Sequence, residues 1–182
     1  MKKKSVVAIL SLVLLSFTNA TLAEAPIILA DSLKASPEHG RASKIVTYVL
    51  GNYHYKKTQL NDELSERILD QYIKMLDPQR THFLKTDIDS FSLHKHLVDD
   101  YLKQPDLDPM FNIFKTFRKR LENRISFSLS QLEITFDFKK TESLIIDRSK
   151  EHWPANVTQL NNIWRKKVKN DVLSLRLAGK DS

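Results

Sequence analysis

The feature that most restricts the fold of this chain is the return of an apolar side chain every three to four residues between positions 36 and 179. This spacing gathers apolar side chains on one face of an α-helix, whereas a half-buried strand requires strict alternation. The sequence also contains only three glycines, Gly40, Gly51 and Gly179, which is few for a fold built from many tight turns. We therefore predict an all-α fold, an irregular bundle of about five helices joined by short polar turns.

The first two helices have recognisable ends. Residues 36–38 (Ser-Pro-Glu) combine a capping side chain, a first-turn proline and a first-turn acid, which predicts a helix start. A second helix starts at Asn61 or Asp62 and stops before Pro78, because proline disfavours helix in the residue that precedes it. The apolar positions are Ala42, Ile45, Val46, Val49, Leu50 and Tyr53 on the first helix, and Leu64, Ile68, Leu69, Tyr72, Ile73 and Leu76 on the second.

Three more helices follow. Thr86 and Asp89 have capping-box spacing, so a third helix runs from there to a point before Pro105. Asp108 begins a fourth, about 36 Å long if it reaches Leu132 at 1.5 Å per residue. A fifth begins at Asn156 and ends at Gly179. The apolar positions are Ile88, Phe91, Val98, Tyr101 and Leu102 on the third helix, Phe114, Phe117, Leu121, Ile125, Leu129 and Leu132 on the fourth, and Leu160, Ile163, Trp164, Val168, Val172 and Leu175 on the fifth.

Residues 125–138 also contain a strand signal. Apolar and polar side chains alternate from Ile125 to Leu129 and again from Leu132 to Phe138. We retain helix to about Leu132 because the upstream helical stripe continues into it. A short extended segment near 134–138, or a short hairpin there, is the alternative.

The first 23 residues have the layout of a secretory signal peptide. Basic residues 2–4 precede an apolar stretch over 5–17, which is shorter than the ~20 residues of a membrane-spanning helix. Small residues follow up to Ala23. We predict cleavage after Ala23 and a single domain over residues 24–182, with an uncleaved signal anchor as the alternative. The chain has no cysteine, so neither a disulfide nor a lipoprotein anchor is expected.

The net charge gives little support to a nucleic-acid partner. The whole chain carries +7, and loss of Lys2, Lys3 and Lys4 with the leader would lower this to +4. Export from the cytoplasm also argues against nucleic acid. A mildly basic surface of this kind remains compatible with acidic partners or an anionic membrane face.

Short patterns with reactive side chains do not combine into a predicted site. Ser92 and Lys95 match the Ser-x-x-Lys pattern of some acyl-transferases, but the companion Ser-Asp-Asn and Lys-Thr-Gly motifs are absent. His94 and His96 would point apart on a helix, and the other histidines (His39, His54, His82 and His152) are scattered. We therefore predict no catalytic residue, no cofactor-binding residue and no metal ligand in this chain.

Two pairs of acids resemble the paired carboxylates of glycosidases. Asp87 and Asp89 lie at a predicted helix start, where negative charge is favourable without any catalytic role. Asp99 and Asp100 are predicted on a solvated face.

Two basic clusters are predicted to face solvent. The first, on the fourth helix, is interleaved with Phe111, Phe114 and Phe117, a combination that can also bind nucleic acid. On a helix, however, aromatic side chains take the core side and charges the solvent side. The first cluster comprises Lys115, Arg118, Lys119, Arg120 and Arg124; the second comprises Arg165, Lys166, Lys167 and Lys169 and could also serve as a docking face. The sequon at Asn156 is interpreted as a helix cap.

Two blocks of residues resemble the N-terminal helical domain of tail-specific (C-terminal processing) serine proteases. The first block comprises His54, Tyr55, Leu60, Asn61, Ile68, Asp70, Tyr72, the run 76–80 (Leu-Asp-Pro-Gln-Arg), Phe83, Leu84, Asp87, Ile88, Asp89 and Phe91. The second comprises the run 147–150 (Asp-Arg-Ser-Lys), Trp153, Pro154, Leu160, Trp164, Lys167, Val168, Lys169, the run 173–177 (Leu-Ser-Leu-Arg-Leu), Gly179 and Lys180. The blocks occur in the order and at the spacing of that family and cover nearly all of residues 24–182.

This resemblance implies a function for the parent protein. Such proteases are periplasmic endopeptidases that bind apolar C-terminal tails through a PDZ domain and cut with a Ser–Lys dyad, sometimes with a tetratricopeptide-repeat lipoprotein adaptor. The helical region precedes the PDZ domain and catalytic core, and the present sequence stops at Ser182 before either. We therefore expect a truncated, non-catalytic scaffold domain in the periplasm, whose partners are the rest of the protease, its adaptor and protein substrates.

Two alternatives remain open. The chain could act alone, as a periplasmic binding or regulatory module that docks on an adaptor or a full-length protease through an exposed helix face. An independent hydrolase would require activity that depends on Ser92. On the scaffold interpretation, the stripe that ends at Leu175 and Leu177 leaves apolar area exposed, which predicts marginal stability or self-association.

Overall fold

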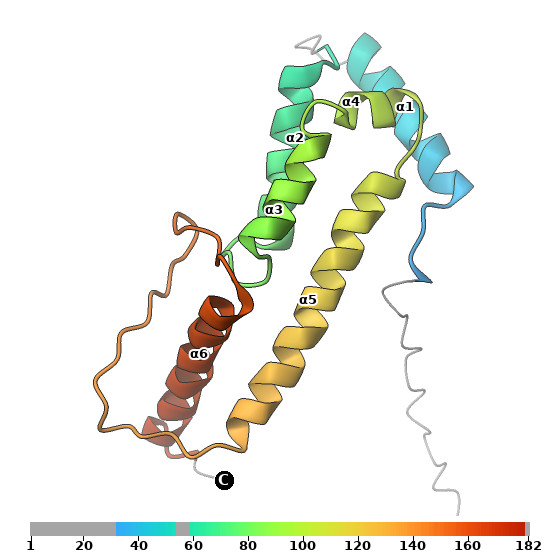
Figure 1. The fold of residues 1–182 in the computed structure, drawn as a ribbon. Coiled ribbons are helices and arrows are strands. Elements are labelled where there is room, and N and C mark those ends of the chain that lie inside the picture. The colour runs from blue at the N-terminus through green and yellow to red at the C-terminus, as the bar shows by residue number, and fades with distance from the viewer. Residues whose placement is uncertain (1–31, 54–58, 181–182) are drawn as a thin grey trace, which may run out of the picture.

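The computed structural model describes residues 32–53 and 59–180, so the predicted signal peptide lies outside the described residues. The helices are α1 (Pro37–Tyr53), α2 (Asp62–Leu76), α3 (Lys85–Phe91), α4 (Val98–Lys103), α5 (Asp108–Leu132) and α6 (Val157–Leu177), and a 3₁₀ turn, η2 (Ser92–His94), follows α3 (Figure 1). No strand occurs in these two segments, which confirms the predicted all-α class. None of the helices within them is long and apolar enough to cross a bilayer.

The predicted caps of α2 and α6 are confirmed. The side-chain oxygen of Asn61 accepts a hydrogen bond from the N–H of Leu64 at 3.0 Å. The side chain of Asn156 accepts one from the N–H of Gln159 at 3.0 Å. After α6, Gly179 has a φ of +68°, and its N–H donates to the carbonyl of Arg176 at 3.0 Å. A left-handed residue at this position is the usual helix stop, and glycine adopts it without steric cost.

The predicted third helix is wrong as a single element, because the structure breaks it into α3, η2 and α4. Its start is also displaced: the carboxylate of Asp87, rather than Thr86, accepts the N–H of Leu84 at 2.9 Å. Near the break, the hydroxyls of Ser90 and Ser92 donate to the carbonyls of Asp87 and Asp89 at 2.7 and 2.6 Å. Serine side chains that bond to nearby backbone in this way compete with helix propagation.

The core lies where α2, the loop after it, α3, α4 and α5 meet. Its buried members are Leu69, Ile73, Phe83, Phe91, Val98 and Ile113. Phe83 comes from the loop and is completely buried. Its ring meets those of Phe91 and Trp153 edge-on, with centroid distances of 5.1 and 6.2 Å. The 77–84 loop is therefore a part of the hydrophobic core, and its conformation fixes how the helices meet.

Helices α5 and α6 run in the same direction, so a long connection returns the chain from the end of α5 to the start of α6 (Figure 1). This connection, residues 133–156, is called the return strap here. The predicted extended segment at 134–138 lies within it and forms no strand. Glu142 fixes the strap to α6, because its carboxylate accepts hydrogen bonds from Arg165 at 2.5 Å and Lys169 at 2.7 Å.

The apolar stripe of α1 does not pack into the described core, contrary to the expectation for an amphipathic helix. The polar side of α1 faces α4 instead: the hydroxyl of Ser43 donates to the carbonyl of Leu102 at 3.2 Å. Ile45 and Tyr53 are 64% and 72% exposed, and Val46, Tyr48 and Val49 are also exposed. We call this set the α1 apolar face.

Candidate functional site

The Ser92–Lys95 pattern does not form a reactive pair. The hydroxyl of Ser92 donates to the carbonyl of Asp89 at 2.6 Å. The ammonium of Lys95 pairs with Glu66 at 2.7 Å. Each side chain thus has another partner, and no base among the described residues is hydrogen-bonded to the hydroxyl of Ser92.

The two neighbouring histidines do not act together either. The Nδ1 atom of His94 lies 2.9 Å from the hydroxyl of Tyr101, and the two rings are in edge contact. His96 is exposed. Among residues 32–53 and 59–180, no three His, Cys, Asp or Glu side chains are close enough to hold a metal ion.

The two acid pairs have structural partners. Asp87 lies in the first turn of α3, as predicted, and also accepts two hydrogen bonds from Arg120 on α5, at 2.9 and 2.8 Å. The prediction for Asp99 is wrong: it is only 3% exposed. Its carboxylate accepts hydrogen bonds from Lys103 and Ser65, both at 2.6 Å, and these bonds lower the pKa of Asp99. The break before α4 turns Asp99 toward α2, which the sequence pattern did not reveal.

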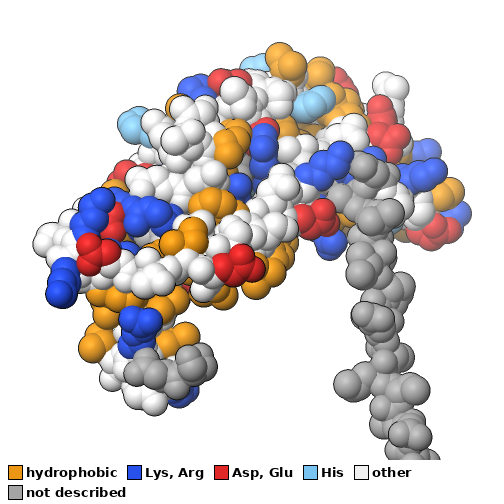
Figure 2. Space-filling view, turned by 60° about the horizontal axis from the view of Figure 1, so that its bottom comes forward, with side chains coloured by type: hydrophobic (Ala, Val, Ile, Leu, Met, Phe, Trp, Pro, Cys, Tyr) orange, Lys and Arg blue, Asp and Glu red, His pale blue; other side chains and the backbone are white. Residues whose placement is uncertain are grey.

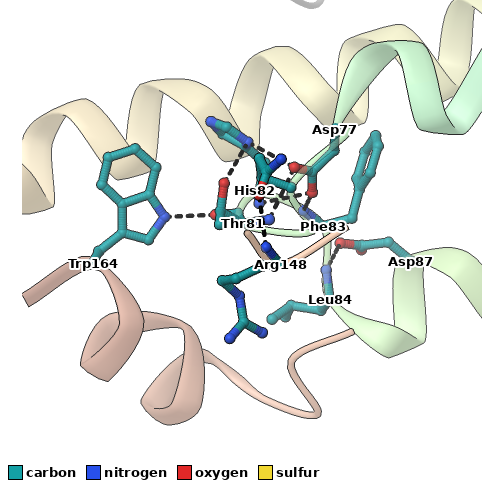
Figure 3. A network of polar contacts seen from close by, with 9 residues as sticks. Asp77, Thr81, His82, Phe83, Leu84, Asp87, Arg148 and Trp164 are labelled. Carbon is teal, nitrogen blue, oxygen red and sulfur yellow. Dashed lines mark hydrogen bonds and ion pairs between the residues drawn. The ribbon is translucent and has the colours of Figure 1, made fainter. Parts of the chain in front are cut away.

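Asp77 is the centre of the most connected polar site (Figure 3). Its carboxylate, which is 1% exposed, accepts the backbone N–H groups of Thr81, His82 and Phe83 at 2.9, 2.8 and 3.0 Å. The ring Nδ1 of His82 lies 3.1 Å from the same carboxylate. Burial alone would raise the pKa of Asp77, but the hydrogen bonds from His82 and the three backbone groups outweigh it and lower that pKa.

The Asp77–His82 pair is built for positioning rather than for proton transfer. The ring of His82 lies between the rings of Phe117 and Trp164, with centroid distances of 5.4 and 5.5 Å. Only 18% of its side chain is exposed. Within the two described segments, no nucleophile is hydrogen-bonded to the other ring nitrogen, as a catalytic triad would require.

The loop around Asp77 ties together segments that are far apart in the sequence (Figure 3). The indole N–H of Trp164 on α6 donates to the carbonyl of Thr81 at 2.5 Å. The backbone N–H of Arg148 donates to the side-chain oxygen of Gln79 at 2.7 Å. The guanidinium of Arg80, a residue with a φ of +52°, donates to the carbonyl of Glu151. We call residues 77–84 with these partners the junction.

The junction is built mainly from the two resembling blocks of the sequence. Asp77, Gln79 and Arg80 belong to the first block, and Arg148 and Trp164 to the second. Their resemblance to the family marked these residues but indicated no role for them. The run from Asp77 to Arg80 contains the sequence signal that was missed, an acid directly before Pro78. The chain turns there, with Arg80 at a positive φ, and the turn encloses the carboxylate of Asp77.

The two basic clusters are less solvated than predicted. On α5, Arg120 pairs with Asp87, and Arg124 is only 6% exposed. On α6, Arg165 and Lys169 bind Glu142 of the return strap. Helical periodicity predicted these cations on the solvent side. It does not reveal that Asp87 and the return strap, which are distant in the sequence, pack against them.

Apolar surface is exposed in two other places. One groove of ≈ 570 Å³ lies among α2, α4 and α5 and is lined by Leu64, Ile68, Tyr72, Met75, Leu102 and Met110. A second, of ≈ 390 Å³, lies between the ends of α5 and α6 and is lined by Ile125, Leu129, Leu132, Val168, Val172 and Leu175. Apolar side chains gather at the end of the molecule where α6 finishes (Figure 2). Leu177 there is 81% exposed, which confirms the predicted exposure of this stripe.

Comparison with known proteins identifies the family of this chain. Residues 46–182 match the family described as the tail specific protease N-terminal domain. Over 146 residues the chain is 36% identical to the Tail-specific protease of Haemophilus influenzae, a match that covers 80% of this chain and 21% of that protein. The chain therefore spans about a fifth of the length of this curated relative. With three quarters of its length matched by the family, the chain belongs to the tail-specific protease N-terminal domain family.

Proposed function

We propose that this chain is the non-catalytic scaffold domain of a periplasmic tail-specific serine endopeptidase. The single observation that carries the proposal is the family match over residues 46–182 together with a relative almost four times as long. Cleavage near apolar C-terminal tails, by a Ser–Lys dyad, belongs to the part of the protease outside this chain. The role of the helical domain is to hold that part and to limit access to its cleft.

The junction suits a scaffold because it is rigid and central. It joins the end of α2 to α6 and to the return strap through buried and partly buried hydrogen bonds, and the ring of His82 packs against Phe117 of α5. A buried polar network whose carboxylate has all its partners favours one arrangement of the elements around it. The junction would therefore keep α2, α5 and α6 in a fixed arrangement when a neighbouring domain packs against them.

The DNA beyond codon 182, in the same or the neighbouring frame, tests this proposal first. We expect it to encode a PDZ domain and a Ser–Lys catalytic core. Unrelated sequence in both frames would count decisively against a protease scaffold.

An activity assay tests the non-catalytic role. We expect purified residues 24–182 to leave a peptide with an apolar C-terminus intact, and Ser92→Ala to change nothing. Cleavage by the chain alone that disappears in Ser92→Ala would overturn the proposal in favour of an independent hydrolase.

The proposed compartment follows from residues 1–23, which have the layout of a signal peptide. N-terminal sequencing of the chain recovered from a periplasmic fraction should begin at Glu24. A chain that retains Met1 and stays in the cytoplasm or the membrane would contradict this location.

A second candidate function is favoured by the α1 apolar face. A stand-alone regulatory module would need an exposed face for docking, and α1 presents Ile45, Val46 and Tyr53 outward. We expect a stoichiometric complex with a tetratricopeptide-repeat lipoprotein adaptor, lost in Val46→Glu and retained in Asn52→Glu, which adds the same charge to an exposed polar position on α1. Failure to form that complex would remove this candidate.

A further inference from the structure

Arg124 on α5 is a buried cation without an anionic partner in the described part of the chain. Its side chain is almost wholly enclosed, and one terminal nitrogen donates to the side-chain oxygen of Asn161 on α6 at 2.5 Å. Its Nε atom is buried and has no hydrogen-bond partner among residues 32–53 and 59–180. Asn161 is neutral, so the positive charge stays uncompensated.

Arg120, one turn earlier on the same helix, has the counter-ion that Arg124 lacks within the described segments. Arg120 makes a two-pronged ion pair with Asp87, whereas Arg124 has only an amide and the ring of Phe127, 5.2 Å from its guanidinium carbon. Burial and the neighbouring charge of Arg120 lower the pKa of Arg124, as expected for a cation that lacks a counter-ion. A buried charge without an opposite charge is costly, and natural cores avoid it.

The hydrogen bond between Arg124 and Asn161 joins α5 and α6 next to the end of the groove, although neither residue is part of its lining. Ser128 follows Arg124 by one turn on the same face, lines the groove, and has a buried hydroxyl without a partner in the described residues. Of the charges on the groove, Lys167 lies over the ring of Trp164 and Asp171 is exposed. Asp171 is ten residues, roughly 15 Å, along α6 from Asn161. The groove thus has apolar walls, and the buried cation beside its end is not neutralised by the acid that lines it.

We propose that this groove holds an amphipathic helix from the part of the tail-specific protease outside this chain, and that a carboxylate of that helix pairs with Arg124. The inference rests on the proposed function. A relative of which this chain spans only 21% supplies ample further sequence of the same polypeptide. An apolar groove between two helices accepts the apolar face of a third, and the uncompensated arginine beside its end selects an acid at one end of that face.

A substitution whose effect changes sign tests the ion pair. In residues 24–182 alone, Arg124→Met should leave the Tm unchanged or raise it, because it removes an unpaired buried charge and keeps most of the volume. In the complete protease, whether one polypeptide or the chain with its separately encoded remainder, the same substitution should lower the Tm. Arg120→Met is the matched control and should lower the Tm in both, because Asp87 loses its partner.

Every other pattern overturns the inference. If Arg124→Met lowers the Tm in both proteins, Arg124 acts only through Asn161. If it lowers the Tm in neither, no carboxylate reaches it.

Photo-crosslinking identifies the occupant. A benzoylphenylalanine at Leu129, in the groove, should crosslink in cells to a protease peptide outside this chain that carries Asp or Glu among helically spaced apolar residues. The same probe at exposed Ser130, which does not line the groove, should not. Crosslinks to a second copy of this domain or to an unrelated protein, or none at Leu129, would overturn the occupant. The scaffold proposal would survive that result, since it depends on the remainder being a protease and not on this groove.

Discussion

Asp77 holds three backbone N–H groups and a histidine in a site that water does not reach. Asp77→Asn replaces one acceptor oxygen by an NH₂ group that faces donors. We expect a loss of about 2–4 kcal/mol of unfolding free energy, measured by urea titration of residues 24–182. Asp106→Asn, at an exposed acid, should stay within about 0.5 kcal/mol of the parent. Equal stability of Asp77→Asn and the parent would mean that the junction does not hold the fold.

The stability that Glu142 contributes by holding the return strap should depend on pH. Hydrogen bonds from Arg165 and then Lys169 lower the pKa of Glu142 to about 2 from an ordinary value of 4.5. Because the folded-state pKa is depressed, the stabilisation is complete above pH 4.5 and is lost as the pH falls toward 2. Between these values the parent should lose more stability than Glu142→Gln. Identical pH profiles of the two proteins would show that the ion pair contributes nothing.

At the residue scale, the sequence predicted the caps but not the buried charges. Asn61 and Asn156 cap helices through contacts three residues away, and such local contacts can be recognised in a sequence. Asp99 and Arg124 were assigned to solvent because their burial depends on α2 and α6, which lie 34 and 37 residues away at the contacting residues. Long-range partners of this kind leave no trace in local periodicity.

At the element scale, the orientation of α1 is the clearest departure from expectation. Its stripe is helical, as predicted, but the side that packs on α4 is the one that carries Ser43 and Thr47. A hydrophobic stripe predicts that a helix has a partner, and not which partner it has. The division of the third predicted helix had a local cause in Ser90 and Ser92, which bond to backbone carbonyls.

This orientation predicts the effect of a charge on α1. In residues 24–182 alone, Val46→Glu should change the unfolding free energy by no more than about 0.5 kcal/mol, because the side chain is exposed. Ser43→Leu, on the side that faces α4, should destabilise by about 1–3 kcal/mol through overpacking. Chemical denaturation of the two variants measures both effects. A large loss for Val46→Glu would place the stripe against the core.

At the scale of the whole molecule, the exposed α5–α6 groove predicts self-association of the isolated chain. Sedimentation velocity of residues 24–182 should show concentration-dependent association that Leu129→Glu reduces and Ser130→Glu leaves unchanged. Strictly monomeric behaviour of the parent with a sharp thermal transition would contradict this expectation. The fold class, five of the six helix starts to within a residue or two, and the family could all be read from the sequence; the junction and the groove needed the three-dimensional arrangement.

The return strap has a consequence for how this domain matures. Trp164 bonds to Thr81 across 83 residues, and Trp153 completes the aromatic core around Phe83. A chain that emerges from its N-terminus has therefore delivered α2, α3, α4 and all of α5 before either tryptophan is available. Contacts of such long sequence separation form late and slowly. During synthesis, the N-terminal half must wait with an unfinished interior, so the moment at which α6 emerges sets the earliest time at which this domain can resist proteolysis.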